Sequence, residues 1–366
     1  MSGTLRVGFD MTPAGLHQGG VGRYTTDLAA ALGRTPGVEL HRLGGGGRGS
    51  GGLGKLAGRA ERTLLYYPLV LDRQAAAHDV DLVHCPGALV PLKLSRPLVL
   101  TIHDVLPWRL PELFSRSMLA RRKVLLSRAA SRASRVLVAS EYARSEVIEL
   151  LEIPDRRVSV AHLGVDRRFQ PVEPDPVRLA HRFGIPPDPF VLWVGTPEPR
   201  KNLSVLLRAF ALVRRRAPEC SLVLVGAEGA WDHDTARELE MLGRSVIRLG
   251  VVSDDELVAL YSATNCFVFP SLYEGFGLPP LEAMACGAPV VAADRASLPE
   301  VVGDAGVLVD PTDPDAIADA VERVVLDADA ADGMRRRGLR RAREFTWDRC
   351  AEQTVEAYRA ALDDPR

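Results

Sequence analysis

The sequence feature that most constrains the fold is an apolar strand followed by a glycine-rich turn and a short helix, over residues 267–287. Residues 267–269 read Phe-Val-Phe before a proline, which is typical of a buried strand in a parallel sheet. We expect the helix to begin at Pro280, because proline lacks the N–H that a first helical turn leaves unpaired. The pair 286–287, Cys-Gly, then ends the helix. The stretch therefore predicts one strand–turn–helix unit of an open α/β sheet.

Two carboxylates flank the turn in this stretch. Glu274 is expected at the carboxyl edge of the sheet, and Glu282 in the first turn of the following helix. Open α/β sheets bind ligands at that edge, and a carboxylate there can accept both hydroxyls of a ribose. The alternative is that Glu282 only complements the helix dipole and that Glu274 is a solvated loop residue.

Length and composition limit the classes of protein to consider. The chain has 366 residues, 46% of them apolar, and a formal net charge of −1. This length predicts two domains with separate cores, and the near-neutral charge gives no reason to expect a nucleic-acid partner. Five cysteines are scattered without a C-x-x-C pair, which argues against a disulfide framework or a structural zinc site.

Short apolar runs alternate with helical patterns along the whole chain, which predicts doubly wound parallel sheets. The expected strands are 5–9, 38–43, 81–85, 98–102, 135–139, 158–163, 190–194, 222–225, 246–249, 267–269, 289–292 and 306–309. Prolines gather at 171–176 and 185–189, between two such arrays. We therefore predict two Rossmann-like domains facing a central cleft, residues 1–168 and 169–345, with residues 346–366 as a helix that returns to the first domain.

The chain shows no signal peptide and no apolar run long enough to span a bilayer, so a cytoplasmic location is expected. Residues 44–58 are a glycine-rich run that reads as a flexible surface loop. Residues 64–71 are apolar and follow Lys55, Arg59 and Arg62. The favoured interpretation is a helix packed on the sheet, and the alternative is peripheral contact with the cytoplasmic face of a membrane.

Two loops carry features suited to anions. The first reads Gly-Gly-Val-Gly at 19–22 and opens into a helix from Arg23, so its backbone N–H groups can approach a ligand. Its spacing is not that of a dinucleotide fingerprint. The second places Arg200 and Lys201 between a strand and a helix N-terminus, where fixed cations and free N–H groups suit a pyrophosphate. A solvated surface is the alternative for an isolated Arg-Lys pair.

His103 ends a strand of the first domain, followed by Asp104, which either orients the imidazole or caps the turn. Aspartate pairs of the D-x-D type, which hold a metal in some glycosyltransferases of another fold, occur at 79–81, 232–234, 313–315 and 327–329. A pattern this frequent has little specificity, so no metal is predicted.

Taken together, these residues resemble the GT4 family of retaining glycosyltransferases, which have the GT-B fold of two Rossmann-like domains. The resemblance covers nearly the whole chain. It runs through Gly19–Tyr24, His103-Asp104, Ser140-Glu141, Gly164-Val165-Asp166, Gly195–Asn202, the E-x7-E element from Glu274 to Glu282, Leu298–Gly303 and Asp310-Pro311. The loop from Gly195 to Asn202 is most similar to that of bacterial mannosyltransferases that use GDP-mannose. The glycine run at 44–58 is the main departure from the family pattern.

The resemblance implies roles for these residues. Arg200 and Lys201 hold the donor pyrophosphate and stabilise the leaving nucleoside diphosphate. Glu274 binds the donor sugar, Glu282 binds the ribose, and His103 contacts the transferred sugar. The donor site further includes Gly20, Gly195, Gly275, Phe276, Gly277 and Leu278.

The implied reaction moves a hexose, mannose in the first place, from a nucleotide sugar to a glycan or lipid-linked acceptor, with retention and without a metal or other cofactor. No conventional protein nucleophile is then needed, and Asp104 is disfavoured as one. Three alternatives stay open from the sequence: a UDP-sugar donor, a nucleotide-sugar epimerase, and a non-catalytic nucleotide-sugar binding protein.

Overall fold

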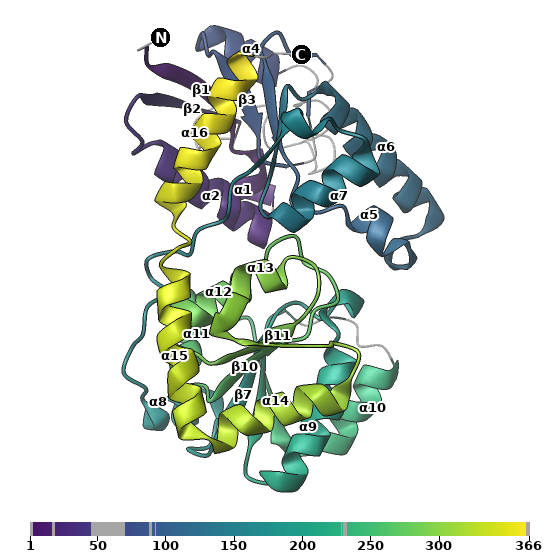
Figure 1. The fold of residues 1–366 in the computed structure, drawn as a ribbon, viewed down its shortest axis with the longest axis vertical. Coiled ribbons are helices and arrows are strands. Elements are labelled where there is room, and N and C mark those ends of the chain that lie inside the picture. Colours follow the sequence, from purple (N-terminus) through teal and green to yellow (C-terminus); the bar gives the residue numbers. More distant parts are fainter. Residues whose placement is uncertain are drawn as a thin grey trace, which may run out of the picture. The chain divides into compact units, whose positions relative to one another are not determined.

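A computed structural model describes residues 3–16, 19–44, 70–87, 90–91, 93–227, 229 and 233–363. The chain divides into two compact units (Figure 1). The N-terminal unit consists of Met1–Gly164 and Trp347–Arg366, and the C-terminal unit of Val165–Thr346. The second unit is thus inserted between the main part of the first unit and its last helix.

The N-terminal unit is built on a parallel sheet with the strand order β2-β1-β3-β4-β5-β6. Its strands are β1 (Leu5–Asp10), β2 (Val38–Leu43), β3 (Leu82–Cys85), β4 (Leu98–Thr101), β5 (Arg135–Val138) and β6 (Val158–Val160). Since β2 lies on one side of β1 and β3 on the other, the chain reverses its direction of winding between β1 and β3. Such a reversal leaves a crevice at the carboxyl ends of the strands.

Helices cover both faces of this sheet. One face packs against α4 (Leu71–Ala77), α6 (Arg116–Arg132) and α7 (Glu141–Leu151). The other carries α2 (Gly20–Leu32) and the last helix, α16 (Trp347–Asp363), which contact each other along the sheet (Figure 1). Two short helices, α1 (Thr12–Leu16) and α5 (Leu106–Arg109), follow the carboxyl ends of β1 and β4.

The C-terminal unit repeats the architecture with the strand order β12-β11-β10-β7-β8-β9. Its strands are β7 (Phe190–Val194), β8 (Ser221–Val225), β9 (Val246–Gly250), β10 (Cys266–Phe269), β11 (Val290–Ala293) and β12 (Val307–Val309). Here the reversal of winding falls between β7 and β10, which pair directly. The loops after these two strands are therefore neighbours at the carboxyl edge.

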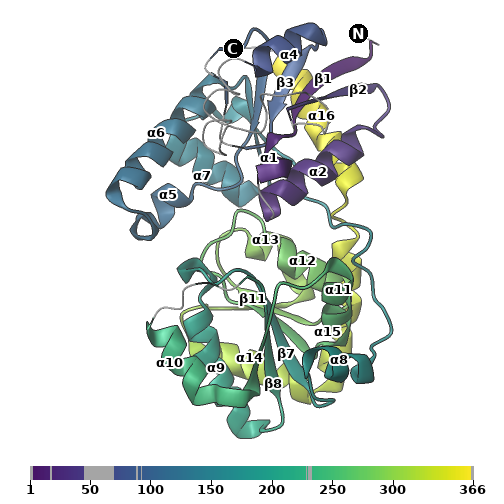
Figure 2. The same cartoon turned by 180° about the vertical axis from the view of Figure 1, so that it is seen from behind.

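Two layers of helices enclose this second sheet (Figure 2). One layer contains α9 (Leu203–Arg216), α10 (His233–Leu242) and α14 (Pro314–Leu326), and the other α11 (Asp254–Ala263), α12 (Leu278–Ala285) and α13 (Leu298–Val302). Near the second layer, α15 (Ala328–Ala342) packs against α12, and α8 (Pro176–Phe183) follows the proline-rich segment. The apolar side of α9, which carries Leu206, Phe210 and Val213, is buried in the core.

The prediction of two doubly wound parallel sheets is confirmed, and within the described residues every one of the 12 predicted strands forms. Two helix starts were predicted wrongly. α2 begins at Gly20 rather than Arg23, and α12 begins at Leu278 rather than Pro280, so Glu282 lies in its second turn. In both helices, a glycine or proline expected in the loop before the helix lies instead in the first turn of the helix. The backbone N–H groups of a first turn have no partner within the helix, so both residue types fit there.

Of the glycine run 44–58, only Gly44 falls within the described residues, and of the apolar stretch 64–71 only residues 70 and 71. None of the described helices has the length and apolar character needed to cross a membrane.

Candidate active site

The candidate site in the C-terminal unit is formed by the loops that leave β7 and β10. The β7 loop carries Arg200 and Lys201 in a 3-10 turn (Pro199–Lys201), and the β10 loop carries Glu274. The two loops are tied by a backbone hydrogen bond of 2.8 Å from the N–H of Leu272 to the carbonyl of Arg200. Residues 73 positions apart in sequence thereby meet at the point where the winding reverses.

The carboxylate of Glu274 binds both cations of the neighbouring loop. Its Oε1 lies 2.6 Å from Lys201 Nζ and its Oε2 lies 3.0 Å from an Arg200 guanidinium nitrogen. Arg200 also pairs through Nε with Glu198 at 2.8 Å, and Lys201 Nζ lies 4.6 Å from the ring centroid of Phe269. The predicted cation pair and the predicted carboxylate therefore form a single charge cluster.

Burial and charge act against each other in this cluster. Burial lowers the pKa of the Lys201 ammonium, although the nearby Glu274 carboxylate partly restores it. For Glu274, burial alone would raise the pKa, but Lys201 and Arg200 together hold it below its usual value. The carboxylate is thus ionised at neutral pH.

Side chains that the sequence did not single out hold the two loops in place. Asn202 adopts a left-handed conformation with φ of 58°, and its Nδ2 donates to the carbonyls of Pro270 at 3.1 Å and Pro311 at 2.6 Å. Ser297 Oγ lies 2.8 Å from the carbonyl of Glu274 and 2.6 Å from that of Phe276. For the two hydrogen bonds made by Ser297, the only signal in the sequence was a serine just before a short helix.

Glycines allow the backbones around the site to approach closely. Gly226 has φ of 147°, and a Cβ there would lie 1.8 Å from the carbonyl oxygen of Gly195. Gly277 has φ of 124°, and a Cβ there would lie 2.8 Å from Leu298. Both positions therefore require glycine. Next to Gly195, the ends of β7, β8 and β9 enclose a cavity of about 270 Å³, whose lining includes Trp193 and Arg248.

The other residues predicted for this site surround the same turn. Gly275 follows Glu274, Phe276 is buried against Phe345 with ring centroids 5.8 Å apart, and Leu278 begins α12. Glu282 is only 4% exposed, and Tyr261 on α11 donates to its carboxylate at 3.4 Å. Its burial and its hydrogen bond to a tyrosine distinguish Glu282 from a solvated residue that only complements the helix dipole.

In the N-terminal unit, His103 follows β4 and its Nε2 lies 3.0 Å from the carbonyl oxygen of Pro86. The ring of Tyr24 on α2 packs edge-on against the imidazole, with centroids 4.8 Å apart. Asp104 accepts from the N–H of Leu106 at 3.1 Å in the turn that leads into α5, whose N-cap residue is Val105.

Tyr24 is also the first member of a buried hydrogen-bonded chain. Its hydroxyl lies 2.8 Å from Thr101 Oγ1, which lies 2.7 Å from His84 Nε2, and His84 Nδ1 lies 2.7 Å from the hydroxyl of Tyr358 on α16. Burial lowers the pKa of His84 to about 3, so its imidazole is neutral at physiological pH. A neutral imidazole donates on one side only, so His84 donates to one of Thr101 and Tyr358 and accepts from the other.

Gly20 is the first residue of α2, with no side-chain cap from the preceding Gly19. The first helical hydrogen bond of α2 runs from the N–H of Arg23 to the carbonyl of Gly19 at 3.1 Å, so the N–H groups of residues 20–22 precede it.

Aspartates of three of the four D-x-D pairs have structural roles in the described part of the chain. Asp79 pairs with Arg6 and Arg96, and Asp81 accepts from the backbone N–H of Arg6. The first aspartates of the pairs at 313–315 and 327–329 cap α14 and α15, and residue 232 lies outside the described residues. No group of three His, Cys, Asp or Glu side chains suited to a metal ion occurs in the described ranges.

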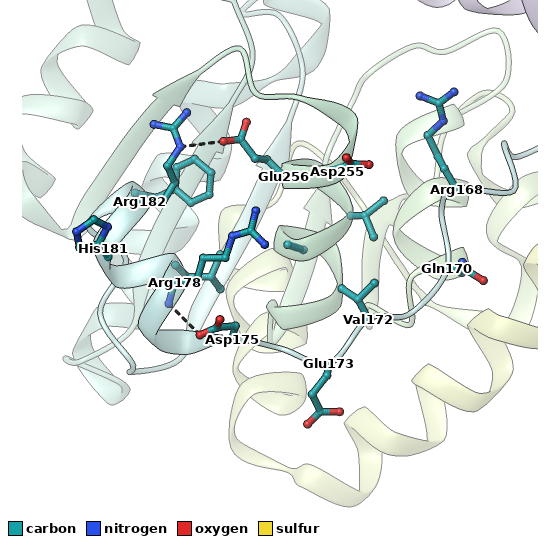
Figure 3. Close-up of a pocket in the computed structure, with 14 residues that line it drawn as sticks. Arg168, Gln170, Val172, Glu173, Asp175, Arg178, His181, Arg182, Asp255 and Glu256 are labelled. Atoms are coloured by element: carbon teal, nitrogen blue, oxygen red, sulfur yellow. Dashed lines mark hydrogen bonds and ion pairs between the residues drawn. The ribbon is translucent and has the colours of Figure 1, made fainter.

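A larger hollow of about 730 Å³ lies between α8 and α11 (Figure 3). None of the residues predicted for the site lines it. Its charges are largely satisfied: Arg182 pairs with Glu256 at 2.9 Å, and Asp175 caps α8 by accepting from the N–H of Arg178. This hollow is therefore separate from the candidate site on the β7 and β10 loops.

Comparisons with known proteins agree with this architecture. The model of "Glycosyltransferase Family 4" matches residues 18–169, and that of "Glycosyl transferases group 1" matches residues 181–341. O-antigen chain mannosyltransferase B of Escherichia coli is 33% identical over 97% of this chain and 100% of its own.

Two solved structures are similar in fold. Sucrose-phosphate synthase from Thermosynechococcus elongatus superposes with a TM-score of 0.73 at 21% identity, over 98% of this chain and 99% of its own. Anabaena HepE in complex with UDP-glucose gives a TM-score of 0.73 at 22% identity, over 97% of this chain and 100% of its own. Both sheets thus have the arrangement of the GT-B fold.

Proposed function

Because the chain belongs to the GT4, or group 1, glycosyltransferases, a retaining family, we propose that it transfers a hexose from a nucleotide-sugar donor to a glycan or lipid-linked acceptor. We further propose that the donor is GDP-mannose. The observation that supports the donor site most directly is the cluster of Arg200, Lys201 and Glu274 at the reversal of winding between β7 and β10.

The chemistry of this cluster suits a leaving nucleoside diphosphate. When the bond between the sugar and the diphosphate breaks, negative charge grows on the phosphate oxygens. Arg200 offers several N–H donors in a planar fork and Lys201 a point charge, both fixed by the carboxylate of Glu274 before the donor arrives. Cations fixed in advance stabilise developing charge without reorganising during the reaction. We propose that they do so without a metal ion.

The remaining roles follow the family resemblance. Glu274 is proposed to exchange part of its contact with the cations for the hydroxyls of the donor sugar, and buried Glu282 to accept from the ribose. His103, whose ring is oriented by Tyr24 and the carbonyl of Pro86, is proposed to contact the transferred sugar. Gly20 presents the first turn of α2 to an oxygen-rich ligand.

Retention is proposed to occur by attack on the same face from which the diphosphate leaves. The acceptor oxygen bonds to the anomeric carbon as the bond to the diphosphate breaks, and the leaving phosphate takes the acceptor proton. No protein nucleophile is needed, which agrees with the Asp104 carboxylate accepting a hydrogen bond from the N–H of Leu106.

Two observations favour different donors. The similarity to an O-antigen mannosyltransferase along the full length of both chains favours mannose, with GDP-mannose as its activated form. The similarity in fold to HepE, which was solved with UDP-glucose, favours a UDP-sugar as the second candidate.

A donor panel tests the proposal. The protein is incubated with GDP-mannose, UDP-glucose and UDP-galactose, with and without an acceptor extract, and release of GDP and UDP is measured. We expect GDP release that depends on both GDP-mannose and acceptor, and a loss of about 10²-fold or more in kcat for Arg200→Ala or Lys201→Ala. UDP release alone would replace GDP-mannose by the second candidate. Near-normal kinetics of both variants would contradict the assignment of the pyrophosphate site.

A further inference from the structure

The helix α6 of the N-terminal unit has a charge unlike that of the chain as a whole. The whole chain balances 46 basic against 47 acidic residues. The 17 residues of α6 contain six basic residues and no acidic residue. The basic residues are Arg116, Arg121, Arg122, Lys123, Arg128 and Arg132. Such a local excess attracts anionic partners whatever the net charge of the protein.

The same helix exposes large apolar side chains. Met118, Val124 and Leu125 are 47%, 48% and 40% exposed, all within eight residues. The other large apolar side chains with comparable exposure in the described part of the chain are scattered over several elements. Single exposed apolar residues are ordinary, whereas a group on one helix marks a surface for interaction.

The two kinds of residue are interleaved. Met118, Arg121, Leu125 and Arg128 follow one another at intervals of three, four and three residues, so they line up along one exposed side of α6. Leu126, Ala129 and Ala130 are the buried contacts of the helix with the sheet. Among the described residues, the guanidinium groups of Arg121 and Arg128 make no ion pair. Their charges are therefore available to an external partner.

Two half-buried aromatic side chains lie beside cations of this helix. Trp108 of α5 and Phe114, just before α6, are half-buried. Lys123 Nζ lies 5.2 Å from the ring centroid of Trp108, and the Arg122 guanidinium lies 4.9 Å from that of Phe114. Aromatic rings beside cations are typical of protein segments at the boundary between lipid headgroups and acyl chains. Figures 1 and 2 both show α6 on the outside of the N-terminal unit, with α5 against one end.

We propose that α6, with α5 and Phe114 beside it, is a docking surface for a membrane rich in anionic lipids. The arginines bind lipid phosphates, and Met118, Val124 and Leu125 enter the boundary between headgroups and acyl chains. A nucleic acid would use the same cations, but it has no place for three aliphatic side chains between them. If the proposed function holds, the surface brings the N-terminal unit to the membrane where a lipid-linked acceptor resides.

Vesicle sedimentation without donor or acceptor tests the proposal separately from the proposed function. The whole protein is mixed with phosphatidylcholine vesicles and with vesicles that contain about a third phosphatidylglycerol. We expect binding to the second kind only, weakened by high salt. Arg121→Gln with Arg128→Gln should weaken binding by about 25-fold, since one arginine near an anionic surface contributes about 1 kcal/mol, or about fivefold. Met118→Ser with Leu125→Ser should weaken it by about tenfold or more, because the apolar contribution is lost.

A matched control exists on α8 in the other unit. Val177→Ser with Arg178→Gln removes one exposed apolar residue and one exposed arginine and should leave vesicle binding unchanged. All the substituted side chains are exposed, so circular dichroism and Tm should match the wild type. Equal binding to both kinds of vesicle, equal binding by the α6 variants, or binding to RNA without binding to vesicles would each overturn the proposal.

Discussion

The charge cluster predicts an unusual response to the substitution Glu274→Gln. In the free protein this carboxylate already neutralises Lys201 at 2.6 Å and Arg200 at 3.0 Å. A donor diphosphate must therefore share its two cations with an anion. Removing the charge of Glu274 frees both cations, so GDP and UDP should bind more tightly to the variant than to the wild type.

The size of the effect follows from the geometry. A carboxylate and a phosphate on opposite sides of one cation lie about 6 Å apart, and their repulsion at an effective dielectric constant of about 20 is about 3 kcal/mol. Solvent access and salt reduce this value, so we expect a gain of about 1–3 kcal/mol, or roughly 5- to 150-fold in affinity. Turnover should fall at the same time if Glu274 binds the donor sugar. The free energy of unfolding should fall by about 3–5 kcal/mol, because Lys201 is left buried without its partner.

Isothermal titration calorimetry with GDP and UDP at pH 7 measures the affinity, and urea unfolding measures the stability. Glu198→Gln is the matched control, since Glu198 pairs with the same Arg200 but its side chain is 46% exposed. This control should change either quantity by less than about 1 kcal/mol. Weaker binding of GDP to Glu274→Gln than to the wild type would refute the reasoning.

Four further predictions concern stability and metal dependence. The stability that Glu274 contributes is present above the ordinary carboxyl pKa of 4.5 and is lost as the pH falls through its lower folded pKa, so acid unfolding of Glu274→Gln should lack this component. His84 has a folded pKa of about 3 instead of 6.5, so the wild type should lose stability as the pH falls between these values, and His84→Gln should lose less in urea titrations. Gly226→Ala should prevent folding or lower Tm sharply, because its Cβ would overlap the carbonyl of Gly195, whereas Gly243→Ala, with φ of 51° and open space, should cost about 1 kcal/mol. Transferase activity should survive EDTA, and a strict requirement for Mg²⁺ would contradict the proposed metal-free site.

The local parts of the candidate site were predictable from the sequence. Proline and glycine positions indicated the turns after β7 and β10, and adjacent charges indicated Arg200 and Lys201 as candidates for an anion site. The exact start of α12 was not predictable, because Pro279 and Pro280 both fit the first turn of a helix. The helix begins at Leu278. A local pattern leaves such one- or two-residue shifts open.

Contacts between distant residues were not predictable. No local pattern relates Ser297 to the turn at Glu274, which it binds by a hydrogen bond. The same holds for Tyr24 and His103, whose rings pack together. The sequence gives no sign that Tyr358 on the last helix would reach His84 in the core of the first unit.

By itself, the sequence determined the alternation of strands and helices, the loops that carry the candidate site residues, and the family resemblance, because all three depend on residues near one another in the chain. The tertiary structure decided that Glu274 neutralises Lys201 before any donor is present. That pairing arises only because β10 lies directly beside β7, which is a consequence of strand order and not of sequence distance. The two carboxylates of residues 267–287 thus have different environments: Glu274 lies among cations, and Glu282 lies beside a buried tyrosine.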